Sequence, residues 1–279
     1  MNHTETTAAQ IRELKIQGAN AIAKEALRAL ATDLEENPGA DREALASILS
    51  AARPNEPMLR NLLRAFLGAD FSSRGFQSLA EDMLDRLQHE EAAIAASGAG
   101  LIHDGMAVFT HCHSSSAVGV LKEAHRRGVQ FKVFNTETRP RFQGRTTASE
   151  LAADGIQVVH MVDSAAKYAL DGADLFLFGA DAVLPSGYLI NKVGTGIFCV
   201  VASRYDVPTY CATHTLKVVR DVADESVEQR DPAEVWPGAP PGVLVLNPAF
   251  DKVHLKYVTA FVTERGLLKD VLGARPWGA

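Results

Sequence analysis

Short apolar runs alternate with helical patterns from about residue 101 onward. The expected strands are almost continuously apolar and cover residues 106–111, 131–135, 156–162, 174–180, 207–213, 243–250 and 257–264. The segments with helical spacing cover residues 116–128, 144–155, 164–172 and 195–205. Strands and helices in this order indicate βαβ units, and continuous apolar runs are typical of strands covered on both faces. The sequence therefore predicts an α/β domain with a parallel sheet over residues 101–279.

The first hundred residues instead carry apolar side chains at helical spacing. Helices are expected over residues 11–34, 42–52, 57–68 and 78–102. Gly18 interrupts the first of these segments, and a glycine in a helical pattern marks a break or a close backbone approach. We therefore expect an N-terminal helical domain, residues 1–100. The charged, Pro- and Gly-rich residues 224–242 are expected to form a surface loop.

The composition restricts the environment and the partners of the chain. A formal net charge of −6 argues against non-specific binding of nucleic acid, which uses basic surfaces. Three cysteines, Cys112, Cys199 and Cys211, form no CxxC pair and no disulfide framework. The N-terminus has no apolar signal core, and no apolar run approaches the roughly 18 residues of a membrane span. We expect a cytoplasmic protein that does not contact membranes.

Candidate functional residues follow the expected strands, because ligands of parallel α/β sheets bind at the carboxyl ends of the strands. Cys112 follows the first strand and precedes a serine run that opens a helix. A helix N-terminus lowers the pKa of a thiol, and Ser114 offers an anion-binding hydroxyl. These features predict a reactive thiol beside a phosphate; a buried, inert cysteine is the alternative.

A metal site at this position is not expected. In a strand, His111 and His113 point to one face and Cys112 to the other, so that the three cannot converge on one ion. Zinc normally takes three or four protein ligands.

Further polar residues follow the later strands. Arg139 and Gln143 follow the second strand, and Asp181 follows the fourth. Asn191 and Lys192 precede a helix that a Gly-Thr pair opens. The alternatives are a solvated loop arginine at Arg139 and a turn aspartate at Asp181. All of these residues are nevertheless expected at one edge of the sheet, and together they indicate a site for a small phosphorylated ligand with acid/base chemistry. Neither GxxxxGK[ST] nor a GxGxxG after the first strand is present, which argues against a nucleotide P-loop or a dinucleotide site.

Several motifs together resemble one protein superfamily. "THCHSS", "GADAVLPSGYLINKVGT" and "NPAFD" are similar to those of the superfamily that unites sugar-phosphate isomerases with the α, β and δ subunits of initiation factor two B. The similarity covers roughly residues 12–270, and "THCHSSS" is most like the archaeal-type ribose-1,5-bisphosphate isomerases. The resemblance implies a helical N-terminal domain, a Rossmann-like domain and a homodimer or dimer-based homo-oligomer.

The resemblance also implies roles for individual residues. Cys112 and Asp181 match the catalytic pair of the isomerases, which the translation-factor subunits generally lack. The positions that match ligand-binding residues are Gly18, Ala19, Arg53, Arg139, Gln143, Asn191 and Lys192. The implied reaction converts α-D-ribose 1,5-bisphosphate to D-ribulose 1,5-bisphosphate, by proton transfer or by a hydride shift, and requires no metal or redox cofactor.

Two departures from the family pattern keep alternatives open. Gln17 stands where the isomerases usually have Arg, which removes one cationic phosphate contact. His214 and Leu216 stand in a segment that usually reads "ETYKF", so that the local loop or subunit contact is expected to differ. The alternatives are a methylthioribose-1-phosphate isomerase and a non-catalytic regulatory protein that binds sugar phosphates or nucleotides.

Overall fold

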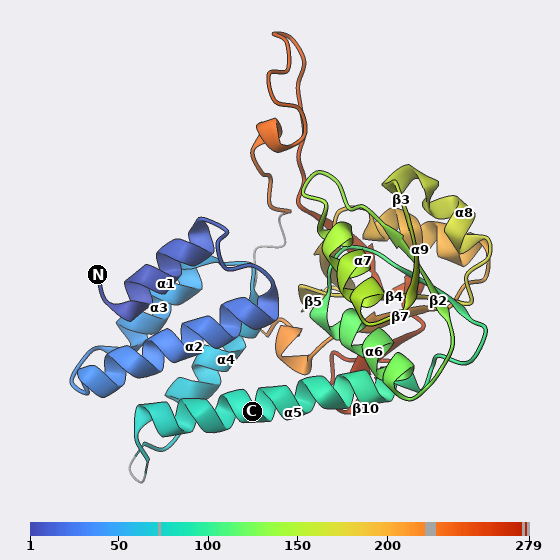
Figure 1. Ribbon diagram of the computed structural model, residues 1–279. Coiled ribbons are helices and arrows are strands. Elements are labelled where there is room, and N and C mark those ends of the chain that lie inside the picture. Colours follow the sequence, from blue (N-terminus) through green and yellow to red (C-terminus); the bar gives the residue numbers. More distant parts are fainter. Residues whose placement is uncertain (72–73, 221–226, 275–276, 278–279) are drawn as a thin grey trace.

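Helices α1 to α5 build the N-terminal region of the chain (Figure 1). The computed structural model describes residues 1–71, 74–220, 227–274 and 277. The helices are α1 (His3–Arg12), α2 (Ala19–Glu36), α3 (Arg42–Ala52), α4 (Pro57–Leu67) and α5 (Phe76–Ala99). The predicted segment 11–34 is broken as expected, because Gly18 has a φ of +85°, which favours glycine. None of the helices in the described ranges is long and apolar enough to cross a bilayer.

A seven-stranded sheet forms the rest of the fold, in the order β10-β9-β7-β4-β1-β2-β3. Its strands are β1 (Ala107–Thr110), β2 (Lys132–Thr136), β3 (Gln157–Met161), β4 (Leu175–Gly179), β7 (Thr209–Ala212), β9 (Ala260–Thr263) and β10 (Gly266–Leu268). Every neighbouring pair is parallel except β9 with β10. The predicted α/β fold with a helical N-terminal region is confirmed.

Helices cover both faces of this sheet. They are α6 (Ser115–Arg126), α7 (Gln143–Ala153), α8 (Ala166–Leu170) and α9 (Thr195–Arg204), with short 3₁₀ turns η1 (Asp163–Ala165), η2 (Thr215–Lys217), η3 (Pro232–Glu234) and η4 (Leu255–Tyr257). Val108 and Leu177 pack in one core with α5 and α6. Phe109 and Phe176 pack in another core with α8 and α9. Successive strand residues point to opposite faces, so that near-continuous apolar runs fill both cores.

The predicted strand 243–250 is wrong over most of its length. The strand β8 (Phe250–His254) begins at the last residue of that run and belongs to a second sheet, in the order β5-β6-β8. This sheet is antiparallel and also contains β5 (Ala182–Leu184) and β6 (Tyr188–Lys192), which the sequence analysis did not predict. Val243, Leu244 and Leu246 are instead exposed, because that segment is part of an extended arm.

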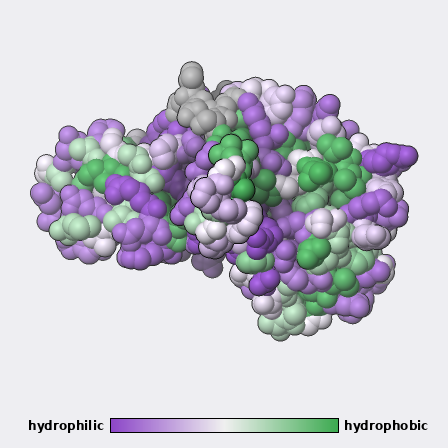
Figure 2. All heavy atoms as spheres, turned by 90° about the horizontal axis from the view of Figure 1, so that it is seen from above, coloured by the Kyte–Doolittle hydropathy of each residue, from purple (hydrophilic) through white to green (hydrophobic). Residues whose placement is uncertain are grey.

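The arm consists of residues 227–249 and rises away from both regions (orange in Figure 1). It includes η3, and its large exposed side chains are Trp236, Val243, Leu244 and Leu246. Figure 2 views the molecule from above, the side toward which the arm rises, and shows hydrophobic residues (green) near the centre of the view. The predicted surface loop 224–242 corresponds to the first part of the arm, although residues 224–226 lie outside the described residues.

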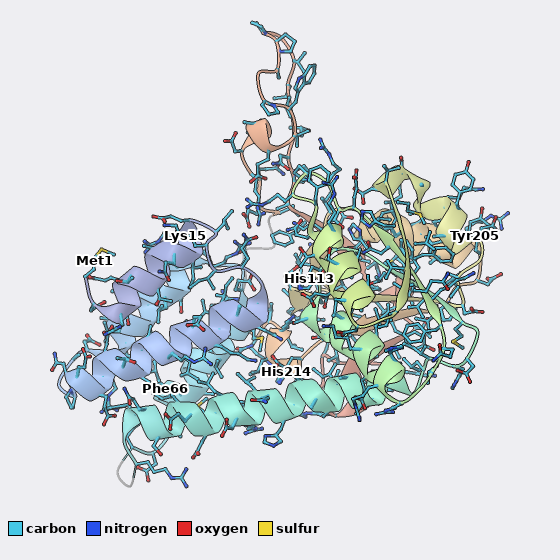
Figure 3. The ribbon with its side chains drawn as sticks, in the orientation of Figure 1. Met1, Lys15, Phe66, His113, Tyr205 and His214 are labelled. Carbon is cyan, nitrogen blue, oxygen red and sulfur yellow. The ribbon has the colours of Figure 1, made fainter. Side chains whose placement is uncertain are left out.

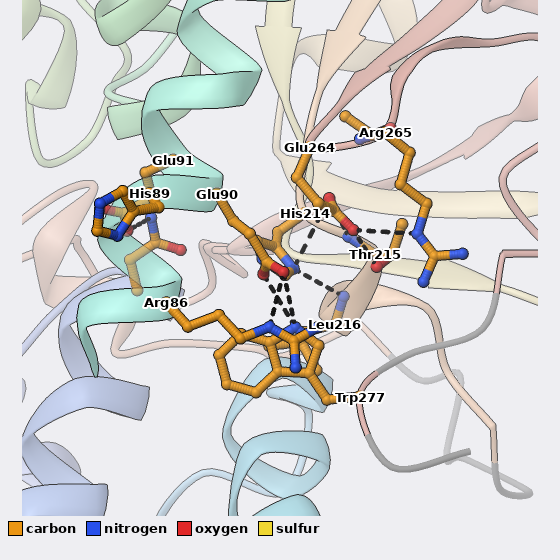
Figure 4. A network of polar contacts seen from close by, with 12 residues as sticks. Arg86, His89, Glu90, Glu91, His214, Thr215, Leu216, Glu264, Arg265 and Trp277 are labelled. Carbon is orange, nitrogen blue, oxygen red and sulfur yellow. Dashed lines mark hydrogen bonds and ion pairs between the residues drawn. The ribbon is translucent and has the colours of Figure 1, made fainter. Parts of the chain in front are cut away.

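The two regions are joined through η2 and α5 (Figure 4). Leu216 of η2 is fully buried in the core of the helical region, and Asn61 of α4 donates to its carbonyl at 2.7 Å. The Leu216 backbone N–H donates to His214 Nδ1 at 3.0 Å, and His214 Nε2 lies 2.7 Å from Glu90 of α5. Trp277 also donates to Glu90, at 2.9 Å. The two residues that depart from the family pattern, His214 and Leu216, therefore lie at the contact between the regions.

Gly98 lies where α5 packs tightly against the sheet region, so that a substitution there tests this packing. A Cβ at Gly98 would lie 2.9 Å from Val120 Cγ1 and 3.0 Å from Val262 Cγ1. We expect Gly98→Ala to lower the free energy of unfolding by about 1–3 kcal/mol, because overpacking outweighs the helix propensity of Ala.

The matched control is Gly119→Ala on the facing helix α6, where a Cβ meets only Ala95 at an ordinary 3.7 Å. That variant should be neutral or slightly stabilised. Urea denaturation of the three proteins measures both effects, and equal stability of the two variants would contradict this packing.

Candidate active site

A cavity of about 620 Å³ lies between α2 and the carboxyl ends of the strands. Nearly all the sequence-predicted site residues line it: Gly18, Ala19, Arg53, Cys112, Ser114, Gln143, Asp181, Asn191 and Lys192. Figure 3 shows His113, another lining residue, on the side of the sheet region that faces α2. The cavity therefore brings together predicted residues as far apart in the sequence as Gly18 and Lys192.

Arg139 is the one predicted site residue that does not line this cavity. Its side chain is exposed, and its guanidinium donates to the carbonyl of Val235 in the arm at 3.3 Å. Its backbone N–H donates to Asp163 at 2.8 Å. In this structure Arg139 contacts the arm just after η3, and its contact with a ligand stays a prediction.

Cys112 lies at the end of β1 in an uncommon backbone conformation. Its φ is +65°, in a region that costs a non-glycine residue of order 1–3 kcal/mol unless its surroundings hold it. The Cys112 N–H donates to Thr138 Oγ1 at 3.0 Å, and the Thr147 hydroxyl donates to the Cys112 carbonyl at 2.8 Å. These two threonines hold the residue at the cavity wall.

The expectation that a helix N-terminus lowers the pKa of the Cys112 thiol is wrong for this structure. Helix α6 begins only at Ser115, and the Ser114 side chain accepts from Ala117 N at its N-terminus. Burial raises the pKa of the Cys112 thiol to about 11, although the positive charge of Lys192 opposes the shift. The thiol is therefore protonated at neutral pH and is suited to donate a proton.

The histidines on either side of Cys112 each have partners of their own. His111 Nδ1 lies 2.8 Å from Thr136 Oγ1, and its Nε2 lies 3.0 Å from the carbonyl of Val193. Burial lowers the pKa of His111 to about 4, so that the ring is neutral. His113 Nδ1 lies 3.0 Å from Thr147 Oγ1, which ties His113 to the same threonine that holds Cys112.

Asp181 lines the same cavity and is the second residue after β4. Its backbone N–H donates to the carbonyl of Ile190 at 2.9 Å, which joins it to the β5–β6 hairpin. The same hairpin ends at Lys192, whose ammonium pKa is lowered chiefly by burial. Lys217 donates to the Ala180 carbonyl at 2.8 Å. Asp181 therefore lies in a part of the cavity with two buried lysines.

The sequence analysis missed seven lining residues with charged side chains: Lys24, Glu25, Arg28, Glu56, Glu91, Lys217 and Arg230. Glu56 is only 3 % exposed, and burial, reinforced by the charge of Asp181, raises its pKa to about 8. Glu56 directly follows "RPN" in the sequence, and that proximity to Arg53 was the only available signal. Burial of Glu56 depends on how the two regions meet, which local sequence does not reveal.

The fold and the cavity define an α/β protein with a helical N-terminal region and a ligand site at the point where the strand order reverses. The chain belongs to the initiation factor 2 subunit family, whose model matches residues 15–270. The proteins similar to this chain include sugar-phosphate isomerases and a translation initiation factor.

Three relatives illustrate the isomerase side of the family. The ribose 1,5-bisphosphate isomerase of Thermococcus kodakarensis is 34% identical over 94% of this chain and 89% of its own length. The ribose 1,5-bisphosphate isomerase of Haloferax volcanii is 36% identical over 97% of this chain and 94% of its own length. The methylthioribose-1-phosphate isomerase of Desulforudis audaxviator is 35% identical over 95% and 86%.

A solved structure illustrates the translation-factor side. The Pyrococcus horikoshii structure described as translation initiation factor eIF-2B superposes with a TM-score of 0.83 at 27% identity, covering 95% of this chain and 96% of that one. The fold therefore does not separate enzymes from translation factors, and the choice depends on the residues of the cavity.

The raised pKa of Cys112 predicts how its thiol reacts. Only the thiolate is nucleophilic, so that the rate of alkylation by iodoacetamide should keep rising up to about pH 11. The Lys192→Met variant should shift the rise to higher pH, because it removes the charge that opposes burial. Mass spectrometry of the peptide that contains Cys112 measures the rate.

The Cys112→Ser variant is the control for alkylation of Cys199 and Cys211, which are buried. A rate that already levels off near neutral pH would show a stable thiolate and contradict the effect of burial.

Proposed function

We propose that this chain isomerises α-D-ribose 1,5-bisphosphate to D-ribulose 1,5-bisphosphate. The observation that carries the proposal is the cavity itself, which holds a protonated thiol, a carboxylate and buried cations. The chain is also 34% and 36% identical, over nearly its full length, to proteins named ribose 1,5-bisphosphate isomerase. A pure binding protein has no need of Cys112 beside Asp181.

Cys112 and Asp181 are proposed as the acid/base pair. The bond from C1 to the ring oxygen breaks first, its electron pair stays on that oxygen, and Asp181 delivers a proton there. In the proton-transfer route, the thiolate form of Cys112 takes the proton from C2, and the thiol so formed gives a proton to C1, so that the hydrogen moves through an enolate-like intermediate. The proton of the 2-hydroxyl leaves as the ketone forms. Groups of this kind contribute on the order of 10²–10⁴-fold each.

The phosphates are proposed to bind at two sides of the cavity. Lys192 and Arg230 line the sheet side, and Arg53 extends from the loop before α4. On the other side, the α2 N-terminus at Gly18 and Ala19 presents free backbone N–H groups, a favourable place for an anion. Gln143, Asn191 and Ser114 supply further hydrogen-bonding groups.

Methylthioribose 1-phosphate is the second candidate substrate, because the α2 side of the cavity is less cationic than its composition indicates. Lys24 pairs with Glu91 at 2.8 Å and Arg28 with Glu25 at 2.5 Å. Gln17, in place of the usual arginine, donates to the Leu14 carbonyl at 2.7 Å. A substrate with an apolar group at that side would meet little free positive charge.

The decisive assay follows each sugar phosphate by NMR in D₂O. We expect ribulose 1,5-bisphosphate from the wild-type protein, and losses of on the order of 10²–10⁴-fold in kcat for Cys112→Ser and Asp181→Asn. Deuterium at C1 would support proton transfer, and its absence a hydride shift or a shielded proton. Turnover of methylthioribose 1-phosphate with none of the bisphosphate would select the second candidate, and no turnover of either by the folded protein would select a binding protein.

We further propose that the protein is cytoplasmic and forms a homodimer or a dimer-based homo-oligomer. The exposed apolar side chains of the arm support association, because single domains seldom expose several large hydrophobic groups together. Leu244 is 84% exposed and Leu246 69% exposed.

The oligomer proposal predicts that charge in the arm weakens association. Leu244→Asp combined with Leu246→Asp should shift the mass towards the monomer in light scattering at micromolar concentration. Leu267→Asp, at a 48% exposed residue of the edge strand β10, is the control. A wild-type protein that is monomeric at all concentrations would contradict the proposal.

A further inference from the structure

Glu56 is a buried carboxyl group to which the mechanism above gives no role. It immediately precedes α4 and lines the cavity. Its Oε1 lies 3.4 Å from Arg53 Nε, whereas its Oε2 is buried without a hydrogen-bond partner among the described residues. A buried polar oxygen without a partner costs free energy and calls for an explanation.

Asp181 is the group that Glu56 faces across a second, smaller space. Both residues line a cavity of about 20 Å³ together with Arg53 and Phe250. A space of more than about 10–15 Å³ with polar walls can hold a water molecule. The space is therefore large enough for one water molecule next to both residues.

The charges around Glu56 favour one shared proton. Two carboxylates, Asp181 and Glu228, disfavour its ionised form, whereas Arg53 and Lys217 favour it. Burial is the largest effect and, with Asp181, raises the pKa of Glu56 to about 8. Two carboxyl groups at one site cannot easily ionise together. Below about pH 8 Glu56 therefore holds a proton, while the positive charge of Arg53 is shared chiefly with Glu228, at 3.1 Å.

We propose that Glu56 is the proton-relay partner of Asp181, and that the two carboxyl groups pass a single proton between them during each turnover. The inference rests on the proposed isomerase function. It makes Glu56 a positioning residue, which acts through Asp181 and not on the substrate.

The relay balances over one cycle. At rest Glu56 is protonated and Asp181 is a carboxylate. The proton of Glu56 moves to Asp181, which delivers it to the ring oxygen as the C1–oxygen bond breaks. The doubly ionised pair that remains is unfavourable, and this makes Asp181 a strong acceptor for the next proton. When the carbonyl forms at C2, Asp181 takes the proton of the 2-hydroxyl and returns it to Glu56. No proton is gained or lost overall, and no further reactant is needed.

The test compares wild type with Glu56→Gln, which keeps the shape but cannot release a proton. We expect wild-type kcat to fall as the pH rises through about 8, because ionised Glu56 has no proton to lend. Glu56→Gln should lose on the order of 10²-fold in kcat, with little change in KM, and should not show that decline. Glu56→Asp should retain the decline and part of the activity.

Glu123→Gln is the matched control, since Glu123 pairs with Arg126 and Arg127 on α6 outside the cavity. It should behave as wild type. Infrared difference spectra, one unit below and one unit above pH 8, give a readout independent of turnover. A protonated-carboxyl band should disappear in wild type and be missing from Glu56→Gln at both pH values.

The outcomes separate the two proposals. An active wild type whose Glu56→Gln variant keeps full kcat and the same pH profile overturns the relay and leaves the isomerase intact. A wild type that converts no bisphosphate overturns the proposed function and the relay step with it. An infrared band that persists in folded Glu56→Gln would assign the proton to another group and likewise overturn the relay.

Discussion

The site depends on the way the chain leaves two neighbouring strands, β1 and β4. After β1 the chain continues into α6 on one face of the sheet, and after β4 it continues through the β5–β6 hairpin into α9 on the other face. Connections that leave to opposite faces open a crevice between the carboxyl ends of the two strands. Cys112 follows β1 and Asp181 follows β4, so that the topology alone brings both residues to this crevice.

Burial then sets the protonation of the groups in the crevice. It raises the pKa of the Cys112 thiol and of the Glu56 carboxyl, and it lowers the pKa of the Lys192 ammonium and of the His111 imidazole. Each shift favours the neutral form, because a low-dielectric surrounding penalises charge. Cys112 and Glu56 therefore keep their protons at neutral pH, and the proposed opening of the sugar ring requires such a proton donor.

The helical region completes the site and does more than cover it. Arg53 and Glu56 come from the loop before α4, and Gly18 begins α2. The contact that holds this region in place is made by Leu216, buried among its helices, and by the polar network around His214 and Glu90 (Figure 4). A family of one fold can thus serve as enzyme or as translation factor, because the chemistry resides in a few side chains where the two regions meet.

The parallel sheet, the helical N-terminal region and the polar residues that follow the strands could be read from the sequence, since periodicity and strand-end position are local properties. Cys112, Asp181 and Lys192 were found in this way. Three features were not predicted: the β5–β6–β8 sheet, the part of the arm after residue 242 and the burial of Glu56. An exposed apolar segment such as residues 243–249 looks like a strand until its neighbours are known. The pKa of Cys112 likewise depends on how deeply the packed chain encloses its thiol, and only the assembled tertiary structure sets that depth.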